Sequence, residues 1–277
     1  MRSWGEIAVL GALVVIAMVL ALTVPRLSAA QDDDAYDVPY VPTPMKTVTK
    51  MLEMAKVSPG DIVYDLGSGD GRIPIAAVRD FGAQRGIGVD INPVRVREAN
   101  ENLRKVATGL ADKVRFDQGD VFDYDFSEAT VLTMYLLTEV NLRLRPKILS
   151  TLKPGTRVVS HDFDMGEWEP DDISEVDSFR HVFMWVVPAQ VEGTWDWSVG
   201  NATYSLALRQ FFQRIEGSLE VGGQSYPVKG AKLSGTDIGF SGGAPAAHFE
   251  GKVVAPGRIE GTVEMDGKKA PFIALKR

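Results

Sequence analysis

A buried strand that runs into a glycine-rich turn and then a helix constrains the fold of this chain more than any other feature. The strand is expected over residues 62–66 and the helix directly after the turn, which carries Gly67, Gly69 and Gly71. Glycines at these positions let a ligand approach the backbone closely. The dinucleotide fingerprint G-x-G-x-x-G needs a third glycine where Arg72 stands, so the pattern disfavours an NAD-dependent oxidoreductase.

Two acidic residues flank the turn and indicate which ligand suits it. Asp65 lies two residues before the first glycine, and Asp90 ends the next apolar run, residues 86–89. A carboxylate that faces the loop repels a pyrophosphate but suits a ligand with an ammonium group. S-adenosylmethionine (SAM) carries an ammonium and no phosphate, and Asp90 is placed to accept hydrogen bonds from both ribose hydroxyls. The alternatives are a structural glycine turn and, for Asp90, an N-cap of the helix expected from Pro93.

Alternation of strands and helices along residues 47–160 predicts an α/β fold. Further strands are expected at 84–90, 114–116, 129–136 and 156–160, and helices at 47–57, 71–81, 93–107 and 139–152. Strands separated by single helices predict a Rossmann-like, doubly wound, mostly parallel sheet. The first of the helices after the turn is expected to be interrupted near its start by Pro74, and the run 180–187 is expected to add an edge strand.

The turn, with Asp65 before it and Asp90 at the end of the next strand, resembles the first two motifs of class I SAM-dependent methyltransferases. In a doubly wound sheet, ligands bind beyond the carboxyl ends of the strands. The resemblance implies cofactor contacts from the ends of the first three strands: Asp65, Gly67, Ser68, Gly69, Gly71, Asp90, Ile91, Asn92, Asp120 and Val121. Asp70 and Arg72 are weaker candidates, because Arg72 could be merely an exposed residue of the first helical turn.

The third of these strand ends leaves a choice among several acids. Class I methyltransferases place an acidic residue here that binds the adenine amine, and Asp120 is the candidate. Asp117, Asp123 and Asp125 lie close by in the sequence, so the choice stays open. A solvated acidic loop is the alternative.

The ends of the fourth and fifth strands are where this enzyme class places substrate contacts. Tyr135 is the candidate catalytic residue, because its hydroxyl could orient an incoming nucleophile; core packing is the alternative. His161, Asp162 and Asp164 could supply a base or metal ligands, but a polar loop is favoured and no metal is predicted. The chain has no cysteine, which excludes disulfides, zinc–thiolate sites and thiol catalysis.

A narrower resemblance covers roughly residues 39–168. Residues 39–42 (Pro-Tyr-Val-Pro), the turn at 65–73 and Asn92-Pro93 resemble the protein-lysine methyltransferases that modify a mitochondrial ATP-synthase subunit, which are membrane-associated. This implies a protein lysine as acceptor, and a small-molecule acceptor stays open. Asp90 stands where that family is expected to have glutamate, and residues 133–139 have no counterpart that we can place.

The N-terminal residues 1–30 differ from the rest of the chain. Residues 7–24 form an uncharged apolar run of a length close to the lower limit for a membrane-spanning helix. Either a membrane anchor or a signal peptide cleaved after Ala30 is expected, with a buried helix as the alternative. Both main alternatives predict a location in the cell envelope. Because SAM is made in the cytosol, an envelope binding or scaffold protein that keeps the fold without activity is the alternative to an enzyme.

Composition and repeats complete the expected organisation. Residues 31–38 are expected to be an acidic linker, 39–190 the methyltransferase domain, and 191–277 a small antiparallel β domain. The last of these contains an internal repeat, residues 214–223 and 258–267, each copy a strand that leads into a glycine hairpin turn. The net charge of −7, without a long basic run, disfavours nucleic acid as a partner.

Overall fold

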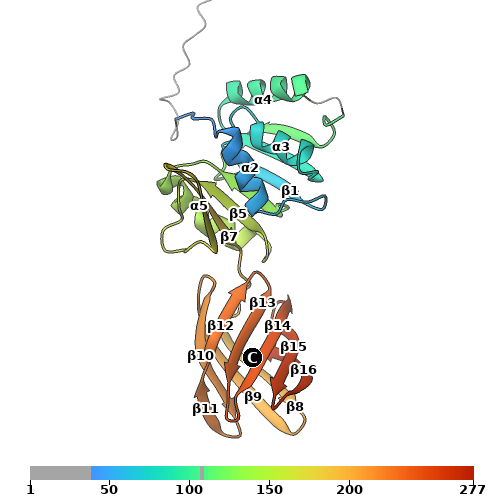
Figure 1. The fold of residues 1–277 in the computed structure, drawn as a ribbon, viewed down its shortest axis with the longest axis vertical. Coiled ribbons are helices and arrows are strands. Elements are labelled where there is room, and N and C mark those ends of the chain that lie inside the picture. Colours follow the sequence, from blue (N-terminus) through green and yellow to red (C-terminus); the bar gives the residue numbers. More distant parts are fainter. Residues whose placement is uncertain (1–38, 107–108) are drawn as a thin grey trace, which may run out of the picture. The chain divides into compact units, whose positions relative to one another are not determined.

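The structure, a computed structural model, describes residues 39–106 and 109–277 (Figure 1). The expected N-terminal apolar helix and the acidic linker lie outside these residues. In the described part of the chain, no helix is both long enough and apolar enough to cross a membrane.

A seven-stranded sheet carries the predicted glycine turn. Its strands are β1 (Ile62–Leu66), β2 (Arg85–Asp90), β3 (Val114–Gln118), β4 (Val131–Met134), β5 (Arg157–His161), β6 (Asp172–Asp177) and β7 (Arg180–Val186). They lie in the order β3-β2-β1-β4-β5-β7-β6, with β1 to β5 parallel and β7 antiparallel to both neighbours. The predicted doubly wound, mostly parallel sheet is confirmed. The strand order reverses between β1 and β4, the kind of point where such sheets bind ligands.

The prediction that residues 180–187 form an edge strand is wrong. β7 lies inside the sheet, where it pairs with β5 on one side and with β6 on the other. The edge strand beside β7 is β6, which was not predicted from the sequence. The reason is that β6 has no buried residue, so no apolar alternation marks it in the sequence.

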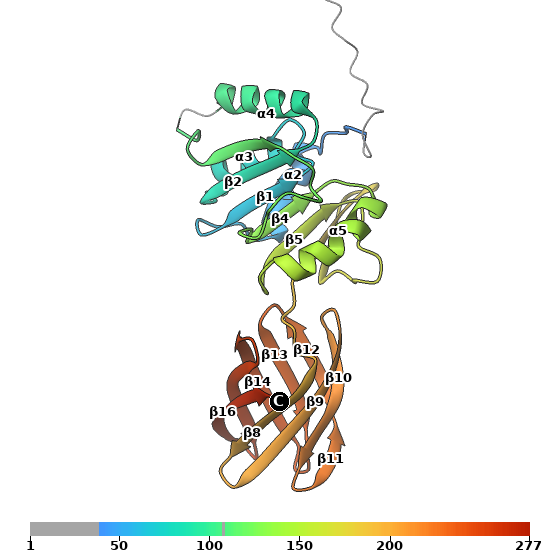
Figure 2. The ribbon, with the colours of Figure 1, turned by 180° about the vertical axis from the view of Figure 1, so that it is seen from behind.

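Helices cover both faces of this sheet: α2 (Met45–Met54), α3 (Arg72–Arg79), α4 (Pro93–Val106) and α5 (Thr138–Thr151). Residues of α2, α3 and α4 share one hydrophobic core with the sheet, and Figures 1 and 2 show α5 on the opposite face. The expected interruption at Pro74 is wrong. Pro74 lies in the first turn of α3, where the amide hydrogen that proline lacks has no partner inside the helix, so α3 is continuous.

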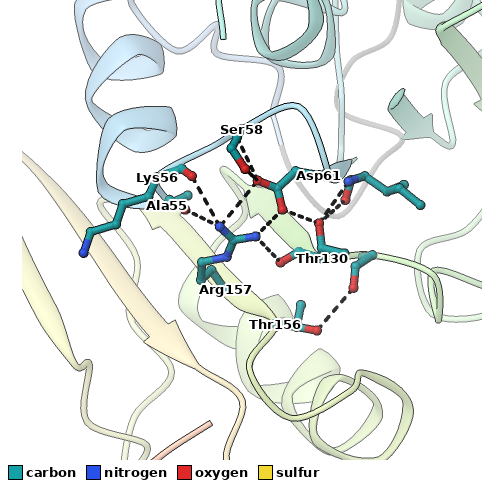
Figure 3. Close-up of polar contacts among 9 residues, drawn as sticks. Ala55, Lys56, Ser58, Asp61, Thr130, Thr156 and Arg157 are labelled. Atoms are coloured by element: carbon teal, nitrogen blue, oxygen red, sulfur yellow. Dashed lines mark hydrogen bonds and ion pairs between the residues drawn. The ribbon is translucent and has the colours of Figure 1, made fainter. Parts of the chain in front are cut away.

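A buried ion pair joins the segments at the amino-terminal edge of the sheet (Figure 3). Asp61, just before β1, accepts hydrogen bonds from Arg157 of β5, from Thr130 Oγ1 at 2.7 Å and from Ser58 N at 2.8 Å. Arg157 also donates to Ala55 O at 2.8 Å, just after α2. Burial alone would raise the pKa of Asp61, but the hydrogen bonds from Arg157 and Thr130 and the Arg157 charge hold this pKa below its usual value.

A second sheet of nine antiparallel strands follows the first. Its strands are β8 (Gly193–Val199), β9 (Ala202–Phe211), β10 (Arg214–Val221), β11 (Gln224–Pro227), β12 (Lys229–Ser234), β13 (Asp237–Gly242), β14 (Ala247–Ala255), β15 (Arg258–Met265) and β16 (Lys268–Lys276). β8 pairs with both β9 and β16, and Val228 N donates to Gly217 O at 2.9 Å, so the sheet curls round an aromatic core. The predicted C-terminal antiparallel sheet is confirmed.

The internal repeat has the same register in both copies. β10 and β15 are the two repeat strands, and each leads through a glycine turn into the next strand, as predicted. Ser218 pairs with Pro227 in the first copy, and Thr262 pairs with Pro271 in the second. The repeated sequence therefore encodes the same hairpin twice.

Equivalent glycines in these hairpins have one structural role. A side chain at Gly217 would collide with the carbonyl oxygen of Ala207, and one at Gly261 with that of Glu250. Each glycine thus lets its strand approach the preceding strand closely, which allows a strongly curved sheet.

Replacing Asp61 by asparagine should lower the free energy of unfolding by about 3 kcal/mol, because Arg157 would lose its buried partner. Urea unfolding measures this. Asp80→Asn is the control: Asp80 forms an ion pair with Arg79 at the surface, so its loss should cost less than about 1 kcal/mol. Equal effects of the two substitutions would contradict the structural role of Asp61.

The contribution of Asp61 should also depend on pH. Because its pKa is lower in the folded protein than in the unfolded chain, the contribution is complete above the unfolded pKa of about 3.9 and is lost as the pH falls through the folded value. Asp61→Asn should therefore unfold with a weaker acid dependence than the wild type.

Candidate active site

Backbone hydrogen bonds fasten the glycine turn to the end of β2. The amides of Gly67 and Ser68 both donate to Val89 O, at 2.9 and 3.0 Å. The amide of Gly69 donates to Asp90 Oδ2 at 2.8 Å. The three glycines of the turn have φ angles of 52° to 80°, which side chains disfavour. The turn and both predicted acids are thus brought together at the carboxyl ends of β1 and β2.

Gly71 has a packing role that the sequence did not reveal. It is the N-cap residue of α3, with φ 80°. A Cβ atom at this position would lie 2.7 Å from Phe116 Cε1 and 2.9 Å from Ala99 Cβ. Glycine is therefore needed here to pack the turn against α4 and β3, and a cofactor contact at Gly71 stays a prediction.

Asp65 is a buried carboxyl group at the end of β1. Its side chain is 2% exposed, and Oδ1 accepts a hydrogen bond from Thr133 Oγ1 at 2.7 Å. Burial raises the pKa of Asp65 to about 8, and the charges of Asp90 and Asp70 add to the effect. Such a carboxyl group would be stabilised in its charged form by a cationic ligand group, whereas an anionic ligand group would favour its protonated form.

Asp90 holds two backbone amides rather than capping a helix. Its Oδ2 accepts from Gly69 N, and its Oδ1 accepts from Asn92 N at 2.9 Å. The N-cap of α4 is Asn92 itself, whose Oδ1 accepts from Val94 N at 2.9 Å. Burial raises the pKa of Asp90 above its usual value. Next to it, Ile91 is 48% exposed, so an apolar surface lies beside this carboxylate.

The candidates after β3 lie at the protein surface. Asp120 is exposed, and its Oδ1 accepts from Phe122 N at 2.9 Å; Val121 is half-buried. Asp117 pairs with Tyr124 and Arg115, which assigns it a structural role. Asp120 and Val121 as adenine contacts stay predictions.

Aromatic rings gather at the ends of β4 and β5. The ring centre of Tyr135 lies 3.9 Å from that of His161 and 5.8 Å from that of Phe163. Burial and the nearby Asp162 charge raise the pKa of Tyr135, so its hydroxyl stays protonated near neutral pH. His161 is 1% exposed, and burial lowers its pKa. No three His, Asp or Glu residues within 39–106 and 109–277 are arranged to hold a metal ion.

Arg72 and Thr43 lie between the glycine turn and His161. The sequence was consistent with an exposed Arg72, and it did not indicate Thr43 as a residue of the site. Arg72 forms a two-pronged ion pair with Asp70, at 2.9 and 2.6 Å, and its Nη1 donates to Thr43 O at 2.8 Å. Thr43 Oγ1 lies 3.2 Å from His161 Nδ1. The partners of Thr43 are distant in the sequence, so no local motif indicates them.

Comparisons with known proteins agree with this geometry. A family model described as the ANTKMT methyltransferase domain matches residues 65–172. A protein-lysine N-methyltransferase of Saccharolobus islandicus is 51% identical over 153 residues, which cover 54% of this chain and 94% of that protein. The chain belongs to the methyltransferase family that includes this Saccharolobus islandicus protein.

Two further relatives show how far the similarity extends. This class I methyltransferase is 31% identical to a lysine N-methyltransferase of Xenopus laevis that is named for an ATP synthase subunit, over 49% of this chain and 58% of that protein. It thus spans just over half the length of that vertebrate relative. A crystal structure described as an RNA methyltransferase from Salinibacter ruber with S-adenosylhomocysteine is 51% identical, with a TM-score of 0.52, over 55% of this chain and 96% of that one.

The residues at the carboxyl edge fit the cofactor of this enzyme class. Asp65 would face the ammonium group and Asp90 the ribose, while Gly67 and Gly69 would let the cofactor approach the backbone of the turn closely. The hydroxyl of Ser68 is buried and has no hydrogen-bond partner among the described residues. The acidic groups at this edge thus suit a cationic nucleoside.

Cofactor binding should release a proton from Asp65. In the ligand-free protein this group is protonated below about pH 8, whereas a bound ammonium favours its ionised form. Titration calorimetry with S-adenosylhomocysteine near pH 7 should therefore give different heats in phosphate and in Tris, whose ionisation enthalpies differ. Asp65→Asn should bind more weakly and remove the difference. Equal heats for the wild type in both buffers would refute this role.

Removing the Asp90 carboxylate should weaken the binding of S-adenosylhomocysteine by about 1.5–3 kcal/mol, the contribution of hydrogen bonds to a charged group. Asp90→Ala tests this by calorimetry, after a melting curve has shown that the variant folds. Asp112→Ala is the matched control, since Asp112 is exposed and lies before β3. An unchanged affinity of Asp90→Ala would count against the ribose assignment.

Proposed function

We propose that this protein transfers a methyl group from SAM to the side-chain amine of a protein lysine. The observation that carries the proposal is the 51% identity to the Saccharolobus islandicus lysine methyltransferase over 94% of its length. The acidic carboxyl edge of the sheet and the aromatic rings beside it support the same chemistry. A small-molecule amine as acceptor is a less favoured variant of the proposal.

The residues of the chain would bind the cofactor, orient the acceptor and exclude water, rather than react themselves. When bound, SAM supplies a methyl group that its sulfonium already activates. Asp65 and Asp90 would hold the cofactor, while Tyr135 and Phe163 would form an apolar, aromatic wall on the acceptor side. A lysine amine with an ordinary pKa of about 10.4 must lose its proton before it attacks, and such a wall favours the neutral amine. No residue need act as an essential base, because positioning alone contributes strongly to the rate.

RNA is the second candidate acceptor. One specific observation favours it: the Salinibacter ruber relative, also 51% identical, is described as an RNA methyltransferase. The net charge of −7 opposes it, since nucleic-acid binding depends largely on neutralising phosphates with basic residues.

We also propose a location in the cell envelope, because residues 7–24 form an apolar run suited to an anchor or to a signal peptide cleaved after Ala30. The anchor would also give contact with the membrane. A reporter fused to the C-terminus tests whether the residues after this run are exported, and activity of a reporter that functions only in the cytosol would overturn their export.

Methylation assays should separate the acceptors. The full-length protein, in mild detergent, is incubated with methyl-labelled SAM and either lysine-rich histones or total RNA. Hydrolysis of the labelled products should yield methyl-lysine from the histones and no methyl-nucleoside from the RNA, and Asp90→Ala should lower the label. Methyl-nucleosides alone would favour the RNA acceptor. Absence of both products would overturn the proposed function.

A further inference from the structure

Thr43 is linked to both sides of the candidate site. The donor side is the glycine turn, where the cofactor is proposed to bind, and the acceptor side is the group of aromatic rings at the ends of β4 and β5. It lies between Pro42 and Pro44 in the segment before α2, and only 4% of it is exposed. Its backbone carbonyl accepts from Arg72 Nη1 at 2.8 Å, and Arg72 in turn is paired with Asp70 of the glycine turn. The main chain of Thr43 is thus fastened to the donor side of the site.

The side chain of Thr43 reaches the acceptor side. Its hydroxyl lies 3.2 Å from Nδ1 of His161, a residue 118 positions away at the end of β5. The ring of His161 lies against the ring of Tyr135, with a centre-to-centre distance of 3.9 Å. A change in the orientation of the His161 ring would therefore move or loosen Tyr135.

Among the described residues, the contact with Thr43 is the one hydrogen bond of the His161 ring nitrogens. The other nitrogen, Nε2, is buried and has no hydrogen-bond partner among the described residues, although Asp162 Oδ2 lies 3.2 Å away. Asp162 itself is held by the amide of His181, which donates to its Oδ1 at 2.7 Å. The nearby carboxylate contributes a charge but no directional bond.

We infer that Thr43 and His161 are positioning residues: together they hold the Tyr135 ring where the acceptor amine meets the donor turn. The inference rests on the proposed function, in which Tyr135 lies on the acceptor side. Because Thr43 is tied through its carbonyl to Arg72, the same residue sets the acceptor wall relative to the turn that binds the cofactor.

The test separates the role of the Thr43 side chain from that of its main chain. Thr43→Val keeps the volume and the carbonyl bond to Arg72 but removes the hydroxyl. It should lower kcat with histones roughly tenfold, while the affinity for S-adenosylhomocysteine stays within about twofold of the wild type. The matched control is Thr47→Val in α2, whose buried hydroxyl has no partner among the described residues, and which should keep full activity.

Substitution of His161 tests the same link from the other end. His161→Phe keeps an aromatic ring but removes the bond, and it should reproduce the effect of Thr43→Val. Because both changes remove one interaction, the double variant should be no slower than the slower single variant. A Thr43→Val enzyme as active as Thr47→Val, or one that loses cofactor affinity in parallel with kcat, would overturn the inference.

A measurement without acceptor keeps the inference separate from the proposed function. In NMR spectra of tyrosine-labelled protein, the Tyr135 signal should shift in Thr43→Val and stay in place in Thr47→Val, because the neighbouring His161 ring determines its local field. If the wild type methylates no acceptor, the proposed function fails while this experiment still decides the coupling. An unmoved Tyr135 signal would overturn the coupling even in an active enzyme.

Discussion

The hydrogen bond from the Gly69 amide to Asp90 is the interaction on which the site depends. The glycines of the turn can adopt many backbone conformations, so hydrogen bonds from neighbouring segments help to hold its shape. Asp90 does this with one oxygen and holds the amide of Asn92 with the other. One carboxylate therefore orders the glycine turn and the chain that leads into α4, and it is also the group proposed to bind the ribose.

This arrangement places acids close together, and the free protein is destabilised as a result. Asp65 is fully buried beside Asp90 and Asp70, and burial together with their charges raises its pKa to about 8. Since an unfolded aspartate loses its proton near pH ~3.9, the unfolded chain is favoured by this group as the pH rises from about 4 to 8. A cationic ligand reverses the effect, because it stabilises the charged form in the folded state. Affinity for such a ligand is thus linked to a local loss of stability, as expected for functional sites.

The sequence predicted those parts of the fold that are encoded locally. The glycine turn, Asp90 and the helices are marked by periodic apolar residues and short motifs, and the observed elements begin and end within about three residues of the predicted ranges. β6 was missed because an edge strand without buried residues carries no apolar pattern.

The contacts that depend on distant residues could not be predicted. Asn92, and not Asp90, caps α4, which only the backbone geometry decides. Arg72 looked like a surface residue because its partner Thr43 is 29 positions away, and the bond from Thr43 to His161 spans 118 positions. Such pairs follow from the tertiary arrangement of the sheet ends and have no local signature.

The nine-stranded sheet adds a second structure to a methyltransferase unit that is complete without it. The Saccharolobus islandicus relative is matched over 94% of its length by 54% of this chain, so that relative has no room for a sheet of this size. The residues proposed to contact the cofactor or the acceptor all lie between Thr43 and Asp164, on the first sheet and its loops. The second sheet has its own aromatic core and repeats one hairpin twice, with Gly217 and Gly261 in equivalent close contacts. The second sheet therefore contributes none of the residues proposed for the candidate site.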